Sequence, residues 1–135
     1  MSLRTPLGKV KGLGSAKEGV AHWWAQRVTA IALVPLAVWF VINIVRGVHS
    51  ELFVLSFITS PLNALLTIFF IGAALYHGAL GMQVVIEDYV HCKARKLVLL
   101  LLVQFVTIFT AAATILAVIA LHANSLLLQT MSAGQ

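Results

Sequence analysis

Hydrophobic residues fill three long stretches of the chain, at about 28–46, 61–90 and 97–121, and short polar segments separate them. A helix needs about 20 apolar residues to cross the hydrocarbon core of a bilayer. Hydrophobic residues make up 61% of the chain and charged residues only 10%, whereas soluble domains carry about 25% charged residues. The pattern predicts an all-α integral membrane protein with three transmembrane helices. We expect a three-helix membrane domain at 22–122, between a polar, basic N-terminal tail at 1–21 and a C-terminal tail at 123–135.

Lysine and arginine are distributed unevenly around these spans. Five basic residues precede or begin the first span, three (Lys93, Arg95 and Lys96) follow the second, and the opposite side has Arg46. Because cytoplasmic segments carry the excess of basic residues, this predicts a cytoplasmic N-terminus and a periplasmic C-terminus. The net charge of +5 lies at the ends of apolar runs, which favours a lipid bilayer and no nucleic acid as partner. A polar start without a cleavage site favours the bacterial cell inner membrane, as a multi-pass protein, over a mitochondrion.

Local signals refine the three spans. Ser60 suits the N-cap of the second helix and Pro61 its first position. Pro35 predicts a kink in the first span, and Ala74 with Gly78 forms a pair of small residues that permits close approach of a helix or a flat ligand. The segment 47–60 is expected to be a loop, and glycines in the N-terminal tail disfavour a helix there.

One face of the second span carries residues that lipid does not tolerate. His77 is followed at offsets of 4, 7, 11 and 14 by Gly81, Val84, Asp88 and His91, which all lie within about 40° of it on a helix. His77 and Asp88 are then roughly 16 Å apart along this face, at about 1.5 Å per residue. Because ionisable side chains in a membrane face protein or water, we expect another protein surface to cover this face.

A neutral imidazole at mid-membrane depth has three possible roles: a structural hydrogen-bond donor, a proton relay or an axial ligand of heme. Gly78 and Gly81 leave the space beside His77 that a flat macrocycle needs. Six-coordinate heme has two axial ligands, and the remaining histidines lie at or beyond the ends of the spans: His22, His49, His91 and His122. Heme at His77 would therefore require a second ligand from another subunit.

Glu87, Asp88 and Tyr89 end the second span, near the expected cytoplasmic surface. A tyrosine hydroxyl at this depth can donate a hydrogen bond to a quinone carbonyl, and a neighbouring acid can deliver protons. The alternative is an interfacial tyrosine beside solvated acids. Arg27, at the cytoplasmic end of the first span, is suited to a heme propionate, a phospholipid phosphate or Asp88.

The sequence shows no motif of an enzyme that acts alone. It has no nucleophile elbow, phosphate-binding loop or metal-cluster cysteine motif. Its one cysteine, Cys92, excludes an internal disulfide. Catalysis by the lone chain is therefore not expected.

Two motifs resemble a known family. The first is His-Trp-Trp-Ala-Gln-Arg-Val-Thr-Ala at 22–30; the second is Tyr-His followed by Leu-Gly-Met-Gln-Val-Val-Ile-Glu-Asp-Tyr-Val-His up to residue 91. Together with three short spans, they resemble the hydrophobic membrane-anchor subunit of succinate dehydrogenase, the D-type anchor of succinate:quinone oxidoreductase (complex II). The resemblance covers roughly residues 20–122.

The resemblance implies an anchor that packs with a second, C-type anchor subunit and binds heme b between the two. His77 would be one axial ligand of the heme iron, and the C-type anchor would supply the other. Tyr89 would hydrogen-bond ubiquinone with Asp88 beside it. Arg27 would lie near the heme propionates or the quinone site.

The resemblance also implies the rest of a complex. A flavoprotein subunit with FAD would oxidise succinate, and an iron–sulfur subunit would pass the electrons to ubiquinone, joining the tricarboxylic acid cycle to electron transport. Succinate oxidation would then belong to the other subunits of the enzyme. The alternatives are a fumarate reductase anchor, a purely structural anchor without cofactor, and a homo-oligomeric transporter or proton channel with His77 as relay.

Overall fold

The computed structural model describes residues 5–11, 19–47 and 53–133, and its regular structure in these ranges is helical. The helices, in chain order, are α1 (Pro6–Lys11), α2 (Gly19–Gly47), α3 (Phe53–Thr59), α4 (Pro61–Tyr89) and α5 (Lys93–Ala133). The prediction of an all-α fold is confirmed for this part of the chain.

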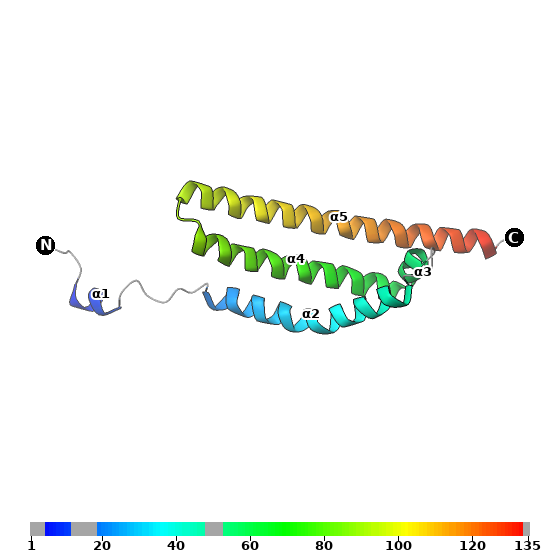
Figure 1. The fold of residues 1–135 in the computed structure, drawn as a ribbon, viewed down its shortest axis with the longest axis horizontal. Coiled ribbons are helices and arrows are strands. Elements are labelled where there is room, and N and C mark those ends of the chain that lie inside the picture. The colour runs from blue at the N-terminus through cyan, green and yellow to red at the C-terminus, as the bar shows by residue number, and fades with distance from the viewer. Residues whose placement is uncertain (1–4, 12–18, 48–52, 134–135) are drawn as a thin grey trace.

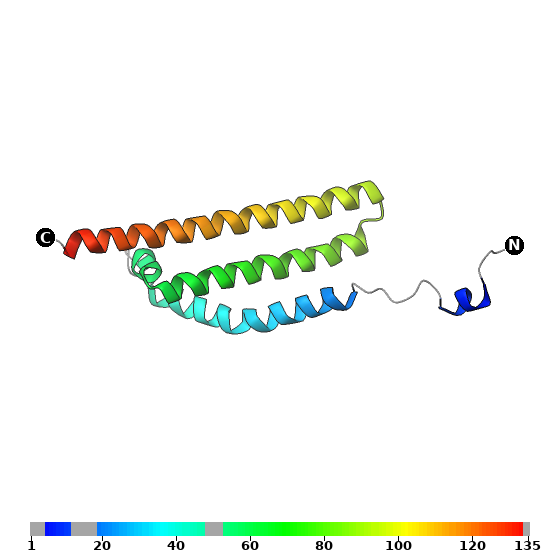
Figure 2. The same cartoon turned by 180° about the vertical axis from the view of Figure 1, so that it is seen from behind.

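The three long helices α2, α4 and α5 run antiparallel to their neighbours, with α4 in the middle and packed against both others (Figures 1 and 2). Each is long and apolar enough to cross a membrane, so the structure has three candidate membrane-spanning helices, as the sequence predicted. The start of α2 and the turn between α4 and α5 lie at one end of the bundle, and α3 lies toward the other (Figure 1). The basic residues that begin α5 therefore share an end with the start of the first span.

Two of the long helices extend beyond the spans expected from hydropathy. α2 begins at Gly19 rather than at 28, because residues 20–27 contain neither glycine nor proline. α5 runs to Ala133, through most of the segment expected to be a tail, for the same reason. At about 1.5 Å per residue, the 41 residues of α5 extend about 60 Å, which is twice the roughly 30 Å of hydrocarbon core. Part of α5 must therefore stand outside the bilayer.

Two short helices lie where none was expected. α1 includes Gly8, and α3 occupies part of the predicted loop 47–60; His49 and Glu51 of that loop lie outside the described residues. α3 is helical because its apolar face packs onto α4 and α5. Buried residues from the three helices form this cluster, namely Ile58, Ala64 and Val118, with Phe57, Ile68 and Leu121 packed against them.

His122 of α5 adds a polar contact to the same cluster. Its Nδ1 donates a hydrogen bond to the carbonyl oxygen of Ile58, at 2.7 Å. Ile58 belongs to the last turn of α3, where helix carbonyls have no partner within the helix. The histidine thus satisfies a carbonyl that would otherwise be unpaired and ties α5 to α3.

The signals at the start of α4 are confirmed. Ser60 has an extended backbone, with φ −71° and ψ 120°, and Pro61 is the first helical residue. The Ser60 side chain makes no capping bond, but its carbonyl accepts from the backbone N–H of Ala64 at 3.0 Å. Pro35 lies inside α2, and the ribbon of α2 bends near its middle, as expected for a proline kink (Figure 1).

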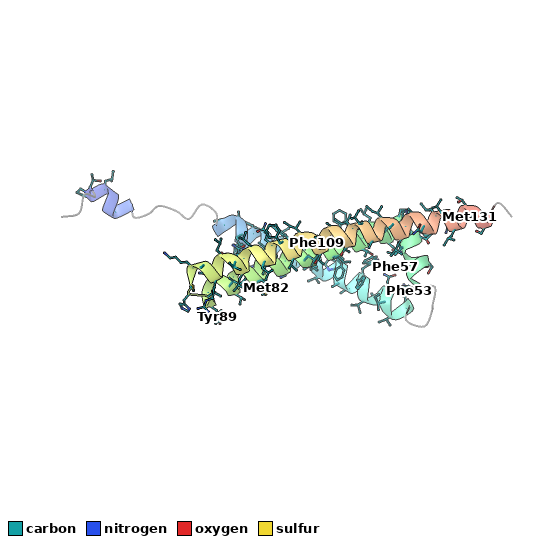
Figure 3. All side chains as sticks on the ribbon, turned by 90° about the horizontal axis from the view of Figure 1, so that it is seen from above. Phe53, Phe57, Met82, Tyr89, Phe109 and Met131 are labelled. Carbon is teal, nitrogen blue, oxygen red and sulfur yellow. The ribbon has the colours of Figure 1, made fainter. Side chains whose placement is uncertain are left out.

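Gly47, the last residue of α2, is buried. A Cβ atom at this position would overlap the ring of Phe53, the first residue of α3. Phe53 in turn lies against Phe57, with ring centroids 5.4 Å apart, and Figure 3 shows both rings in this part of the bundle. Glycine at 47 therefore allows α2 and α3 to approach this closely.

Candidate functional site

His77 lies on the face of α4 that packs against α2 and is partly buried there. Its Nδ1 is 2.9 Å from the hydroxyl oxygen Oγ1 of Thr29. Its Nε2 is 3.5 Å from the side-chain nitrogen of Gln26, which is the outer limit of a hydrogen bond. Both partners belong to α2, so the imidazole is held between two helices of the same chain.

The contacts of Thr29 determine which ring nitrogen of His77 carries the proton. Oγ1 of Thr29 lies 2.7 Å from the carbonyl oxygen of Ala25, and two oxygens this close require a hydrogen between them. A carbonyl has no hydrogen to give, so the single hydroxyl proton of Thr29 points at Ala25. Oγ1 can then only accept from His77, which places the imidazole proton on Nδ1. Nε2 keeps its lone pair, and the amide of Gln26 can donate to it.

Two glycines of α4 lie near His77, and they face different sides of the helix. A Cβ on Gly81, one turn along α4, would meet only the side-chain nitrogen of Gln26, at 3.7 Å, and a Cβ on Gly78 would meet nothing within 4 Å. Gly78 also borders a groove of about 360 Å³ between α4 and α5, together with Ala74 and Met82. The small-residue pair of Ala74 and Gly78 thus faces open space rather than a packed helix.

Further polar atoms lie unpaired on α2 near this contact. Nε2 of His22 and Oε1 of Gln26 are buried, and neither has a hydrogen-bond partner among the described residues. His22, Gln26 and Thr29 follow one another at offsets of four and three, which places them on one face of α2. Two of these residues, Gln26 and Thr29, meet the face of α4 that carries His77 and Gly81.

The acidic end of α4 is open to the surroundings. Asp88 is exposed, and Tyr89 is 77% exposed at the end of the bundle where α4 turns toward α5 (Figure 3). Glu87, in contrast, accepts two hydrogen bonds. Its carboxylate accepts from the Gln83 amide at 2.8 Å, and its backbone carbonyl accepts from Nζ of Lys96 at 2.7 Å.

The structure does not bring Tyr89 and His77 together. They are twelve residues apart on one helix, hence about 18 Å along its axis. They also point about 120° apart around that axis, whereas Asp88 lies on the His77 face. The two side chains therefore lie apart on α4.

Arg27 is exposed on α2. Its guanidinium carbon lies 5.4 Å from the centre of the Trp23 ring, which is within the range of a cation–π contact. In the part of the chain that the structure describes, Arg27 and Asp88 form no ion pair. The pairing of Arg27 with Asp88, one of the three partners considered for it, is therefore not seen.

Residues 1–114 match the family described as succinate dehydrogenase/fumarate reductase transmembrane subunit. The chain belongs to this family. A succinate dehydrogenase hydrophobic membrane anchor subunit of Rickettsia bellii is 37% identical over 116 residues, covering 85% of this chain and 93% of that protein. The subunit of the same name in Paracoccus denitrificans is 36% identical over 110 residues, covering 81% and 85%. That of Rickettsia typhi is 32% identical over 111 residues, covering 82% and 89%. No solved structure matches the chain.

Membership of this transmembrane-subunit family confirms the resemblance that the two motifs carry. It does not by itself assign a role to His77, Tyr89, Asp88 or Arg27. Two residues of the family motif at 22–30, Gln26 and Thr29, were not singled out from the sequence, although they contact His77 in the structure. The signal that could have found them is the helical spacing of His22, Gln26 and Thr29 along the first span.

Proposed function

We propose that this chain is a membrane-anchor subunit of succinate dehydrogenase, with a heme b site at His77 and part of a ubiquinone-reduction site at Tyr89 and Asp88. The observation that carries the proposal is the family match across residues 1–114. Relatives named succinate dehydrogenase anchor subunits, 32–37% identical, support succinate oxidation as the direction. A fumarate reductase anchor is the alternative within the same family.

The surroundings of His77 fit an axial ligand of heme. In the tautomer with its proton on Nδ1, the ring has a lone pair on Nε2, which a metal ligand requires. Its Nδ1–H has an acceptor in Thr29, as the second nitrogen of a metal-bound histidine almost always does. Gly81, on the same face of α4, presents no side chain beside it. Heme b, when bound, supplies a centre that accepts and returns single electrons.

The proposed heme site also needs groups other than His77. No cluster of three or more histidine, cysteine or acidic side chains able to hold a metal occurs within residues 5–11, 19–47 and 53–133. In the proposed site, His77 would be the one ligand that this chain gives to the iron. A C-type anchor subunit would supply the other ligand of the iron. The side-chain amide of Gln26, now 3.5 Å from Nε2, has to move aside when Nε2 binds iron.

The exposed end of α4 suits a quinone. The Tyr89 hydroxyl donates a hydrogen bond to a quinone carbonyl, and Asp88 passes protons to the reduced oxygens. Electrons reach this end from an iron–sulfur subunit, which receives them from a flavoprotein subunit with FAD. With the start of α2 and the start of α5 (Lys93–Lys96) in the cytoplasm of a bacterium, these subunits would dock on the cytoplasmic face of the inner membrane.

The test is to purify the complex through a tag on this chain and record its reduced-minus-oxidised absorption spectrum. A flavoprotein, an iron–sulfur protein and a second anchor should co-purify, with b-type heme bands that His77→Ala removes. His91→Ala, which changes an exposed histidine beyond the end of α4, is the matched control and should leave the bands intact. Bands unchanged in His77→Ala would exclude ligation by His77, and absence of a flavoprotein would favour a channel or transporter.

A second experiment tests the proposed role of Asp88 as a proton relay. Full succinate:quinone activity of Asp88→Asn across the pH range would exclude this role.

A further inference from the structure

We propose that Thr29 is the positioning residue of the heme ligand: its hydroxyl fixes the tautomer and orientation of His77 from a neighbouring helix and raises the basicity of Nε2. This inference rests on the proposed function, because it concerns His77 as a ligand of iron. It assigns to α2 a direct influence on the properties of a heme whose ligand is carried by α4.

The Thr29 hydroxyl is itself held rigidly. Its oxygen lies 2.7 Å from the carbonyl oxygen of Ala25 and 3.2 Å from that of Gln26, both of which are acceptors in the preceding turn of α2. Threonine is branched at Cβ and has few side-chain rotamers in a helix. With its proton committed to these carbonyls, Oγ1 presents a lone pair in a fixed direction, and the Nδ1–H of His77 meets it at 2.9 Å.

A fixed acceptor at Nδ1 has two effects on the opposite nitrogen. It excludes the tautomer with the proton on Nε2, because a protonated Nε2 has no lone pair with which to bind iron. It also prevents the ring from turning away. It also withdraws the Nδ1 proton slightly, so Nε2 becomes a stronger electron donor. A stronger donor stabilises ferric iron more than ferrous iron and lowers the midpoint potential. Loss of such an outer contact typically weakens metal binding about 10–100-fold.

Thr29→Val tests this most directly, because valine keeps the shape of threonine and removes only the oxygen. Thr29→Ser keeps the oxygen and serves as the conservative variant. Thr67→Val is the matched control, since the buried Thr67 also bonds the carbonyl four residues back, Asn63, at 2.7 Å, but the bond lies inside α4 and involves no histidine. Thr29→Ala replaces Thr29→Val if the latter does not assemble.

Two quantities are measured on the purified complex, each normalised to FAD: the heme content after incubation with a heme-binding competitor, and the midpoint potential from redox titration. Thr29→Val should lose its heme at a competitor concentration about 10–100-fold lower than the parent requires. The heme that remains should have a more positive midpoint potential. Thr29→Ser and Thr67→Val should match the parent. Parental heme retention and potential in Thr29→Val would overturn the inference, as would equal changes in Thr67→Val. Heme retained in His77→Ala would instead show that the proposed ligand itself is wrong.

Discussion

The Nδ1 atom of His77 lies 2.9 Å from Oγ1 of Thr29, across the contact between α4 and α2. The sequence predicted that lipid could not cover the His77 face and that a protein surface must do so. At His77 and Gly81 that surface belongs to the same chain, because Thr29 and Gln26 of α2 lie against them. If His77 binds heme as proposed, a second anchor subunit would be required for the other ligand of the iron and not for shielding the polar ring at His77.

Replacement of Gln26 should affect heme in the opposite way to replacement of Thr29. The Gln26 amide occupies the space at Nε2, and its own oxygen is buried without a partner, which typically costs about 1–3 kcal/mol. We expect Gln26→Leu to bind heme at least as tightly as the parent and to take up added heme faster. Heme content per FAD and the rate of uptake by heme-depleted complex are the measurements.

Gln104→Leu is the control for this change, because Gln104 is an exposed glutamine of α5, the helix on the far side of α4 from α2. It should leave both quantities unchanged. Loss of heme from Gln26→Leu comparable to that from Thr29→Val would show that the Gln26 amide supports the bound heme instead of occupying its place.

Removal of the Tyr89 hydroxyl should separate two activities. If Tyr89 binds quinone as proposed, Tyr89→Phe would lose one hydrogen bond to the quinone carbonyl, which should slow succinate:quinone electron transfer about tenfold. Succinate oxidation with an artificial acceptor that reacts at the soluble subunits should not change. Tyr76→Phe, which alters the other tyrosine of the chain, is the control and should retain both activities. Loss of both activities in Tyr89→Phe would indicate failed assembly.

Cys92 should react unusually fast with alkylating agents. It directly precedes α5, and hydrogen bonds from the backbone and side chain of Arg95, with the backbone of Ala94, lower the pKa of its thiol. A lowered pKa means that the thiolate is already present at a pH where an ordinary cysteine is protonated. The rate of alkylation by iodoacetamide should therefore reach half its maximum at a lower pH than the rate for an unperturbed, exposed cysteine measured in parallel. A midpoint at or above that of the unperturbed cysteine would contradict the assignment.

The same cysteine reports the orientation of the bundle. If the turn between α4 and α5 is cytoplasmic, a membrane-impermeant maleimide should label Cys92 in inside-out vesicles and not in right-side-out ones. A Cys92→Ser, Ser132→Cys variant moves the thiol to the opposite end of α5 and should give the reverse pattern. Labelling of Cys92 from the outer side would invert the proposed topology.

His122 should contribute to stability without affecting the heme. His122→Ala leaves the carbonyl of Ile58 without its donor, which should lower the free energy of unfolding by about 1–3 kcal/mol. His122→Asn retains a donor and should recover part of the loss. The thermal unfolding midpoint in detergent measures both, with the heme spectrum expected to stay constant. Unchanged stability in His122→Ala would show that water replaces the imidazole at this carbonyl.

The long helices could be predicted from sequence because lipid constrains their composition directly. A segment that crosses the bilayer must be predominantly apolar, so the three spans could be recognised from the sequence without knowledge of their packing. α3 could not be predicted in this way. Its residues Phe53–Thr59 are too few to cross a membrane, and their helical state depends on contacts with α4 and α5.

Part of the candidate site could also be predicted from the sequence. His77 was conspicuous because an imidazole in an apolar span is costly, and a polar face along α4 follows from helical spacing. Thr29 and Gln26 were not identified, because the register of one helix against another depends on the packing of their side chains. The roles of His77, Tyr89, Asp88 and Arg27 remain predictions that the variants above decide.

The burial of Gly47 beneath the ring of Phe53 constrains how related chains can vary. A side chain at position 47 and a bulky ring at position 53 exclude one another, so a change at either position alters what is tolerated at the other. Among relatives, these two positions should therefore change together. A larger residue at 47 is expected to accompany a small one at 53. This coupled variation would identify the contact between α2 and α3 that precedes the second long helix, α4.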